Sequence, residues 1–246
     1  KLGTLEGALD LIKSGDCIAL SAYANEPTNF VSRLHTIAPR VEGVKLWTIL
    51  MMGEYPVMSD PALSGHIDIV SFFYNADCRR GHSTGRYAIV PMNLHSAGPA
   101  TINSCRPNVF VCSVTPMDES GNVYISFDLQ ASLEWLECAD EVIFEVNPQI
   151  PRTYGETAVP IEKADYIYEV SNRPMPVAPP TPASAKEKTI GEYVASLIND
   201  GDCIQLGIGG MPGAVGEALM GKHDLGIHTE MITASMGRLM RAGAVT

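Results

Sequence analysis

The sequence lacks any long hydrophobic run. No apolar stretch approaches the roughly 20 residues that a membrane-spanning helix needs, so we expect no membrane insertion. A signal peptide is also absent, and the chain begins at Lys1, from which we expect the natural start to be missing. Basic residues are few: 17 Lys and Arg stand against 28 Asp and Glu, a net charge of −11 without any block of like charges. This balance argues against nucleic acid or an anionic membrane as a partner.

Metal-binding and disulfide patterns are missing too. The six cysteines form no C-x-x-C pair and the histidines have no metal-ligand spacing, so we expect no metal. Two cysteines lie inside apolar strand-like stretches, which favours buried, reduced thiols in a cytoplasmic protein. No serine stands in a G-x-S-x-G elbow. The stretch RRGHSTG, with Arg79, Arg80 and the nearby Arg86, could hold a small polyanion, although we favour a plain surface loop with cations.

The sequence does contain an internal repeat. LIKSGDCIAL (Leu11–Leu20) and LINDGDCIQL (Leu197–Leu206) are identical at seven of ten positions, at a constant offset of 186 residues. The match continues with one residue of slippage, so that Pro27 aligns with Pro212. Each copy has the pattern of a helix, a short buried strand, a loop and a second helix. The repeat therefore predicts an α/β unit that occurs twice in one chain.

The first helix of each copy is predicted from apolar residues at positions i, i+3 and i+4. In the second copy these residues are Val194, Leu197 and Ile198. We expect Gly15 and Gly201 to end the two helices as left-handed caps.

The segment between the two copies is rich in proline and reads as an interdomain connector. We expect an N-terminal α/β domain over residues 1–172, a linker over 173–187 and the start of a C-terminal α/β domain over 188–246. Because the second copy has only about sixty residues where the first has about 185, we expect a second domain that is incomplete here and a whole protein of roughly 430 residues.

The remainder of the first domain also reads as α/β. The runs VKLWTIL, HIDIVSFF, NVFVCSV and EVIFEV have the β-branched and aromatic character of strands, and LQASLEWLECA is typical of a helix. The stretch TPMDESGNVYIS predicts a strand end, a turn at residues 118–121 and a returning strand.

One position differs in chemistry between the two copies. Aligning VKLWTILM with LGIHTEMI places Ile49 opposite Glu230. Strand alternation puts Trp47, Ile49 and Met51 on one face, so the second copy carries a carboxylate where the first is apolar. A buried carboxylate is costly unless it is paired or functional, which makes Glu230 a candidate site residue. The alternative is that Glu230 lies at a strand end and reaches solvent.

The loop after the first strand also differs between the copies. The first copy has SAYANEP where the second has GIGGMP, so the turn itself does not call for three glycines. Glycines allow a backbone to approach a ligand and to present its N–H groups at the start of a helix. The loop is therefore a candidate ligand site.

These residues carry a family resemblance. GDCIQLGIGGMPGAVGEAL, DLGIHTEMIT and LMRAGAVT, together with GRYAIVPMNLH and VTPMDESGNVYIS in the first domain, resemble the acetyl-CoA hydrolase/transferase family of class I coenzyme A transferases. The resemblance includes the 4-hydroxybutyrate and butyryl-CoA:acetate enzymes. It implies two similar open α/β domains with the active site between them, the second domain being truncated in this chain.

The resemblance also implies roles for particular residues. Glu230 would be the catalytic nucleophile, and the coenzyme A-binding loop would consist of Gly207, Ile208, Gly209, Gly210 and Met211. Ala234 departs from the family pattern, which implies an acidic or amide residue there. The family's other coenzyme A motifs lie later in the second domain, so we expect this chain alone to be inactive.

The implied reaction is nucleophilic catalysis with ping-pong kinetics. It transfers coenzyme A from a short-chain acyl-CoA (acetyl-, butyryl- or 4-hydroxybutyryl-CoA) to a carboxylate through a covalent glutamyl-CoA thioester. Coenzyme A is a substrate, and no cofactor is bound permanently. The backbone N–H groups of residues 208–210 are candidate oxyanion donors. A homo-oligomer is the family's habit.

The sequence leaves two alternatives open. A thioester hydrolase would use the same fold and the same glutamate, with water in place of the acceptor carboxylate. A non-catalytic α/β protein could instead bind a nucleotide through the glycine loop, but it would have no use for Glu230.

Overall fold

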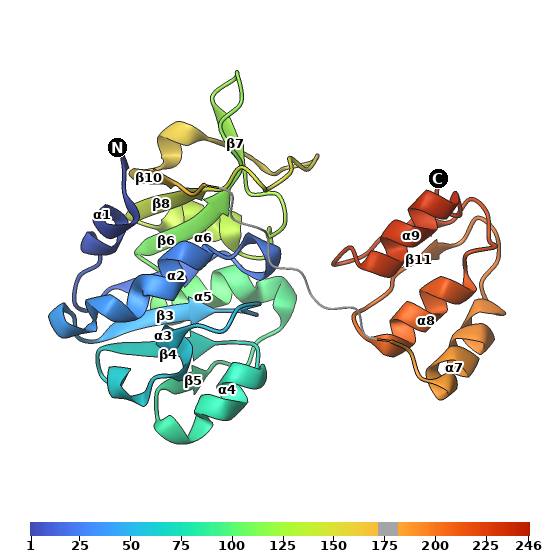
Figure 1. Ribbon diagram of the computed structural model, residues 1–246, viewed down its shortest axis with the longest axis horizontal. Helices are drawn as coiled ribbons and strands as arrows, with labels where there is room; N and C mark the ends of the chain where they lie inside the picture. The colour runs from blue at the N-terminus through green and yellow to red at the C-terminus, as the bar shows by residue number, and fades with distance from the viewer. Residues whose placement is uncertain (172–181) are drawn as a thin grey trace. The chain divides into compact units, whose positions relative to one another are not determined.

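The computed structural model describes residues 1–171 and 182–246, which form two compact units, Lys1–Val177 and Ala178–Thr246 (Figure 1). Most of the expected linker, 173–187, lies outside the described residues. The last three residues of that expected linker, 185–187, are helical. Helix α7 (Ala185–Ala195) begins there because the side chain of Ser184 caps its first turn. None of the helices in the two described ranges is both long and apolar enough to cross a membrane.

The first unit is built on an eight-stranded sheet in which every pair of neighbouring strands is parallel. The strand order is β1 (Leu2–Gly3), β10 (Tyr166–Glu169), β8 (Glu141–Val146), β6 (Val109–Val114), β2 (Cys17–Leu20), β3 (Val44–Thr48), β4 (Ile67–Ser71) and β5 (Tyr87–Ile89). The chain proceeds outward from β2 to β5, and then returns to build from β6 to β10 on the other side. This arrangement confirms the predicted α/β class and creates a topological switch point between β2 and β6.

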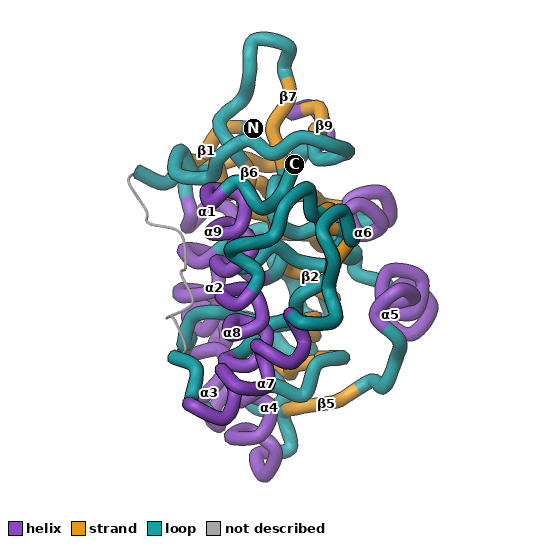
Figure 2. Tube along the Cα trace, turned by 90° about the vertical axis from the view of Figure 1, so that its right-hand side faces the viewer, coloured by secondary structure: helices purple, strands orange, loops and turns teal. Residues whose placement is uncertain are grey.

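Helices cover both faces of this sheet, which explains why its strands are apolar on both sides. Helices α1 (Leu5–Asp10), α2 (Thr28–Leu34) and α3 (Pro56–Ser59) pack on one face, and α5 (Ala97–Cys105) and α6 (Ser132–Cys138) lie on the other (Figure 2). The short α4 (Ala76–Gly81) lies between β4 and β5 in the chain. Trp47 and Ile49 pack together as expected, but Met51 joins the core on the opposite face because β3 ends at Thr48 and alternation stops there.

The predicted turn after β6 is present. The Asp118 carboxylate accepts the N–H groups of Ser120 and Asn122, both at 2.9 Å, and the O–H of Tyr124 at 2.6 Å. The Tyr124 bond contributes most to holding the pKa of Asp118 below its usual value. The returning strand β7 (Asn122–Tyr124) pairs antiparallel with β9 (Ala158–Pro160), a partner that the local sequence does not indicate.

The second unit contains α7, β11 (Cys203–Ile204), α8 (Gly210–Ala218), β12 (Gly226–Ile227) and α9 (Ala234–Ala242). Strands β11 and β12 are parallel. The expected apolar stripe is wrong at Leu197, which is 79% exposed because α7 ends at Ala195. Gly15 and Gly201 do adopt left-handed backbones, with φ of 83° and 84°. They lie in the turns before the strands, however, and not at the helix caps.

Candidate functional site

The strand register supports the alignment of the two copies. In the first unit Cys17 of β2 pairs with Lys45 of β3, and in the second unit Cys203 of β11 pairs with Gly226 of β12. These four residues are equivalent in the sequence alignment, so the structure confirms the alignment across a loop that differs in length.

The two candidate features of the second unit follow its two paired strands. The Ile204 carbonyl accepts the His228 N–H at 3.1 Å, one residue beyond the end of β12. Paired residues of β11 and β12 are separated by 23 positions in the sequence, as Cys203 and Gly226 are. Gly207 and Glu230 have the same sequence separation. The carboxyl ends of parallel strands meet at one edge of a sheet, which is where α/β folds bind ligands. Gly207 and Glu230 each lie three residues beyond the carboxyl end of one of these two paired strands.

Glu230 and its first-unit equivalent have opposite environments. The Ile49 side chain is 1% exposed and packs with Trp47 in the core of the first unit. Glu230 is exposed, in a bend three residues beyond β12, where Thr229 donates its hydroxyl to the Met231 carbonyl at 3.1 Å. Within the second unit the position matches the alternative considered from the sequence, a carboxylate at a strand end that reaches solvent. That position also leaves the carboxylate available to a substrate.

The three glycines of the second-unit loop have different reasons to be there. Gly209, the N-cap of α8, has φ 126° and ψ 176°, a conformation that is essentially restricted to glycine. A Cβ atom on Gly210 would lie 2.7 Å from a carboxylate oxygen of Glu187, whereas one on Gly207 would meet nothing within 4 Å. The first-unit loop also contains a left-handed residue, Tyr23, with φ 55°. The fold of the second unit therefore needs glycine at 209, and only Gly207 is free of both constraints.

The remaining residues of the predicted loop are accessible. Ile208 is 67% and Met211 is 43% exposed, and the first N–H groups of α8 have no acceptor within their own helix. Ala234, the departure from the family pattern, is the exposed first residue of α9.

Sequence reasoning missed a buried carboxylate in the first unit. Glu145 of β8 is fully buried and accepts the N–H groups of Asn29 and Phe30, at the start of α2, at 3.1 and 3.2 Å. The hydroxyl groups of Tyr168 and Ser113 donate to the same carboxylate at 2.6 and 3.1 Å. The first unit thus covers the start of α2 with its own carboxylate. The signal was available, because Glu145 interrupts the otherwise apolar run EVIFEV.

Of the three arginines considered from the sequence, Arg86 is not free to bind an anion. Arg86 is buried and donates to the backbone carbonyls of Val57, Asp60 and Ile67, at 2.9, 2.6 and 2.6 Å. Burial lowers the pKa of its guanidinium group. Arg80 forms an ion pair with Asp77. The described residues hold no group of three or more His, Cys, Asp or Glu side chains that could bind a metal ion.

Known proteins resemble this chain along its whole length. The sequence is 35% identical to a succinyl-CoA:cyclohexane-1-carboxylate CoA transferase of Geobacter metallireducens, over 97% of this chain and 54% of that protein. It is 30% identical to a 4-hydroxybutyrate coenzyme A transferase of Clostridium kluyveri, over 100% of this chain and 57% of the relative. The chain thus spans little more than half the length of the curated relatives that it matches.

Solved structures give the same result. RipA from Yersinia pestis matches with a TM-score of 0.89 at 29% identity, covering 100% of this chain and 59% of RipA. A 4-hydroxybutyrate CoA-transferase from Porphyromonas gingivalis matches with a TM-score of 0.83 at 30% identity, covering 100% of this chain and 58% of that one. The model of the acetyl-CoA hydrolase/transferase N-terminal domain matches residues 1–179. The chain therefore belongs to the acetyl-CoA hydrolase/transferase family.

Proposed function

We propose that this chain carries the nucleophile and the coenzyme A-facing loop of a coenzyme A transferase. One observation supports the proposal most: β11 and β12 pair in parallel, Gly207 and the exposed Glu230 each follow one of these strands by three residues, and α8 begins just after Gly207. The names of the relatives, all of them coenzyme A transferases, support it independently.

The proposed chemistry begins with attack by a Glu230 carboxylate oxygen on the carbonyl carbon of an acyl-CoA thioester. The carbon–sulfur bond breaks, which leaves an acyl-glutamyl anhydride and coenzyme A thiolate. The thiolate then attacks the glutamyl carbonyl, forms the glutamyl-CoA thioester and releases the first carboxylate. A second carboxylate runs these steps in reverse, so the kinetics are ping-pong. No step requires a metal or a permanently bound cofactor.

The loop would supply binding and charge stabilisation. Each tetrahedral intermediate carries an oxyanion that needs N–H donors at about 3 Å. The amides of Ile208, Gly209 and Gly210 stand at the start of α8, where the positive end of the helix dipole favours negative charge. We propose these amides as oxyanion donors and residues 207–211 as contacts for coenzyme A.

The acyl group is proposed at the level of a class. The relatives' names include succinyl-, butyryl- and 4-hydroxybutyryl-CoA or the corresponding acids. We propose acetyl-, butyryl- or 4-hydroxybutyryl-CoA as the donor and a short-chain carboxylate such as acetate as the acceptor. A panel of acyl-CoA donors assayed against acetate would rank them.

The decisive experiment uses the product of the native gene. Incubation with butyryl-CoA followed by borohydride should reduce a glutamyl-CoA thioester at position 230 to an alcohol, which peptide mapping locates. Glu230→Gln should abolish both the adduct and transfer to acetate. Glu192→Gln, at an exposed glutamate on α7, is the matched control and should retain both. An adduct elsewhere, or transfer that survives Glu230→Gln, would reject the proposal.

The same assay separates the two enzymatic alternatives. Without acetate a transferase should consume no more than about one equivalent of butyryl-CoA per active site, and with acetate it should turn over continuously and form acetyl-CoA. Rapid release of free coenzyme A without acetate would identify a thioester hydrolase on the same residues.

We further propose that the protein works in the cytoplasm as a homo-oligomer. All six cysteines are free, which is consistent with a reducing compartment. Light scattering on the native gene product would measure the number of subunits.

A further inference from the structure

Two thiols of the first unit meet at the amino edge of its sheet. Cys17 is the first residue of β2 and Cys105 is the last residue of α5. Their sulfur atoms lie 3.1 Å apart, and the Cys17 thiol also lies 3.4 Å from the Cys105 carbonyl oxygen. The two residues are 88 positions apart in the chain, so the fold alone creates this contact.

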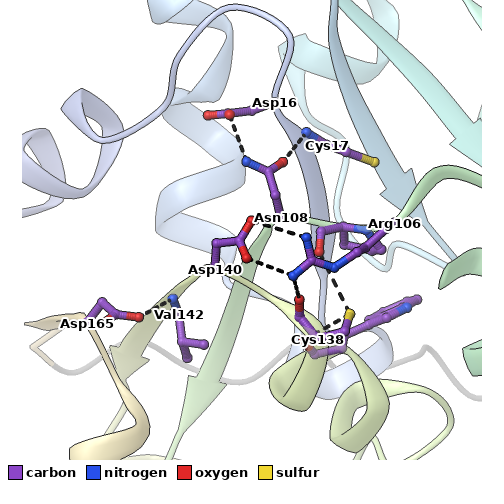
Figure 3. A network of polar contacts seen from close by, with 10 residues as sticks. Asp16, Cys17, Arg106, Asn108, Cys138, Asp140, Val142 and Asp165 are labelled. Carbon is purple, nitrogen blue, oxygen red and sulfur yellow. Dashed lines mark hydrogen bonds and ion pairs between the residues drawn. The ribbon is translucent and has the colours of Figure 1, made fainter.

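Cys17 is held from one side by Asn108. The Asn108 carboxamide oxygen accepts the Cys17 backbone N–H at 2.7 Å, and its nitrogen donates to the Asp16 carboxylate at 2.9 Å (Figure 3). The Asn108 backbone N–H donates to the Cys17 carbonyl at 2.9 Å. The start of β2 is therefore fixed against the start of β6.

Cys105 is held from the other side. Its carbonyl accepts the indole N–H of Trp47 at 3.0 Å. The next residue, Arg106, donates to both carboxylate oxygens of Asp140, at 2.7 and 3.2 Å, and also to the Cys138 carbonyl (Figure 3). Both ends of the short segment from Cys105 to Asn108 are thus anchored, and the two thiols are kept in contact.

The other cysteines have different surroundings. The thiols of Cys78, Cys112 and Cys138 each lie near a backbone carbonyl, those of Phe73, Ser113 and Pro107 respectively. Cys203 is exposed and belongs to the second unit. Within the described residues, Cys17 and Cys105 form the one sulfur–sulfur contact given by the structure.

We propose that Cys17 and Cys105 are an oxidisable dithiol, a modification site that forms a reversible disulfide when the protein meets a peroxide. The sulfur atoms of a disulfide are about 2.05 Å apart, so the pair must close by only about 1 Å. Cys105 is the more accessible of the two and reacts first. The peroxide oxidises its thiol to a sulfenic acid and releases water. The Cys17 sulfur then bonds to the Cys105 sulfur, the sulfenic oxygen leaves as a second molecule of water, and both cysteines end as the disulfide.

The test treats the full chain with hydrogen peroxide in a stepwise titration. The intact mass should fall by two hydrogen atoms, and dithiothreitol should restore it. Peptide mapping without reduction should join the Cys17 peptide to the Cys105 peptide. Cys17→Ser and Cys105→Ser should each reduce this loss of mass to the background level. Cys138→Ser, at a thiol of the same sheet edge, is the matched control and should leave the cross-link intact.

The peptide map of the unmodified chain decides the question even if a serine variant fails to fold. A cross-link to Cys138, or the stepwise addition of oxygen at Cys105 without any cross-link, would overturn the proposal.

Discussion

At the scale of single residues, backbone conformation separates the glycines of the candidate loop. Gly209 occupies a region of φ and ψ that other residues enter only with strain of roughly 1–3 kcal/mol. Gly207 has open space around its Cα and no left-handed backbone. Two neighbouring glycines of one loop therefore differ in what they do, and substitution can distinguish structural need from ligand approach.

Gly209→Ala should destabilise the second unit by about 1–3 kcal/mol, because alanine cannot relax in this conformation. Gly207→Ala should change stability by less than about 0.5 kcal/mol, since the added methyl group meets nothing. The two tryptophans, Trp47 and Trp135, lie in the first unit, so tryptophan fluorescence does not report on the second. Hydrogen exchange of the α8 amides measures both effects instead. Equal protection of α8 in the two variants would contradict this assignment.

Gly207→Ala has a second use in the native gene product. If Gly207 is there so that coenzyme A can approach the backbone, this substitution should raise KM for acyl-CoA while leaving the α8 amides protected. An unchanged KM would remove Gly207 from the proposed binding loop.

At the scale of elements, the first N–H groups of a helix can donate to a side chain of the protein itself or remain available to a ligand. Glu145 reaches from β8 to the first N–H groups of α2 in the first unit. In the second unit Ile208 and Gly209, which precede α8, are exposed, whereas Gly210, its first residue, is buried near the Glu187 carboxylate. The two copies share strand register but differ in what lies at the helix start, which is the location where an α/β fold accommodates an anion.

Glu145→Ala should lower the free energy of unfolding of the first unit by about 3 kcal/mol or more. The change removes a buried acceptor from the N–H groups of α2 and creates a cavity. Glu141→Ala, at the half-buried start of the same strand, is the comparison and should cost less than about 1 kcal/mol. Urea unfolding followed by tryptophan fluorescence measures both variants, and a similar loss in the two would show that Glu145 has no special part in capping α2.

At the scale of the whole molecule, the two units differ in the size of their cores. The first contains an eight-stranded sheet with a hydrophobic cluster on each face, whereas the second has two short strands and a single small cluster. Because small units bury proportionally less apolar surface, we propose that the first unit is a domain that folds alone and that the second is marginal alone.

Separate expression of residues 1–171 and 182–246 tests this division. The first fragment should melt cooperatively, with a Tm within a few degrees of the main transition of the full chain. The second should melt broadly and early. Circular dichroism measures both transitions, and loss of cooperative melting in the first fragment would show that its fold depends on the second unit.

The sequence by itself determined the α/β class, the duplicated unit and the equivalence of Ile49 with Glu230. These features depend on local patterns that the repeat presents twice. The register of β2 with β3 in the first unit and of β11 with β12 in the second agrees with them. The end of α7 was harder to place, because its apolar pattern continues to Leu197, beyond the last helical residue.

Only the tertiary structure decided the contacts between residues distant in the chain. It buried Arg86 against backbone carbonyls, where the sequence suggested a free cation, and it placed the Glu145 carboxylate at the start of α2. It also brought Cys17 and Cys105 together. Each of these contacts requires the order of the strands in the sheet, and periodicity along a single strand carries no information about that order.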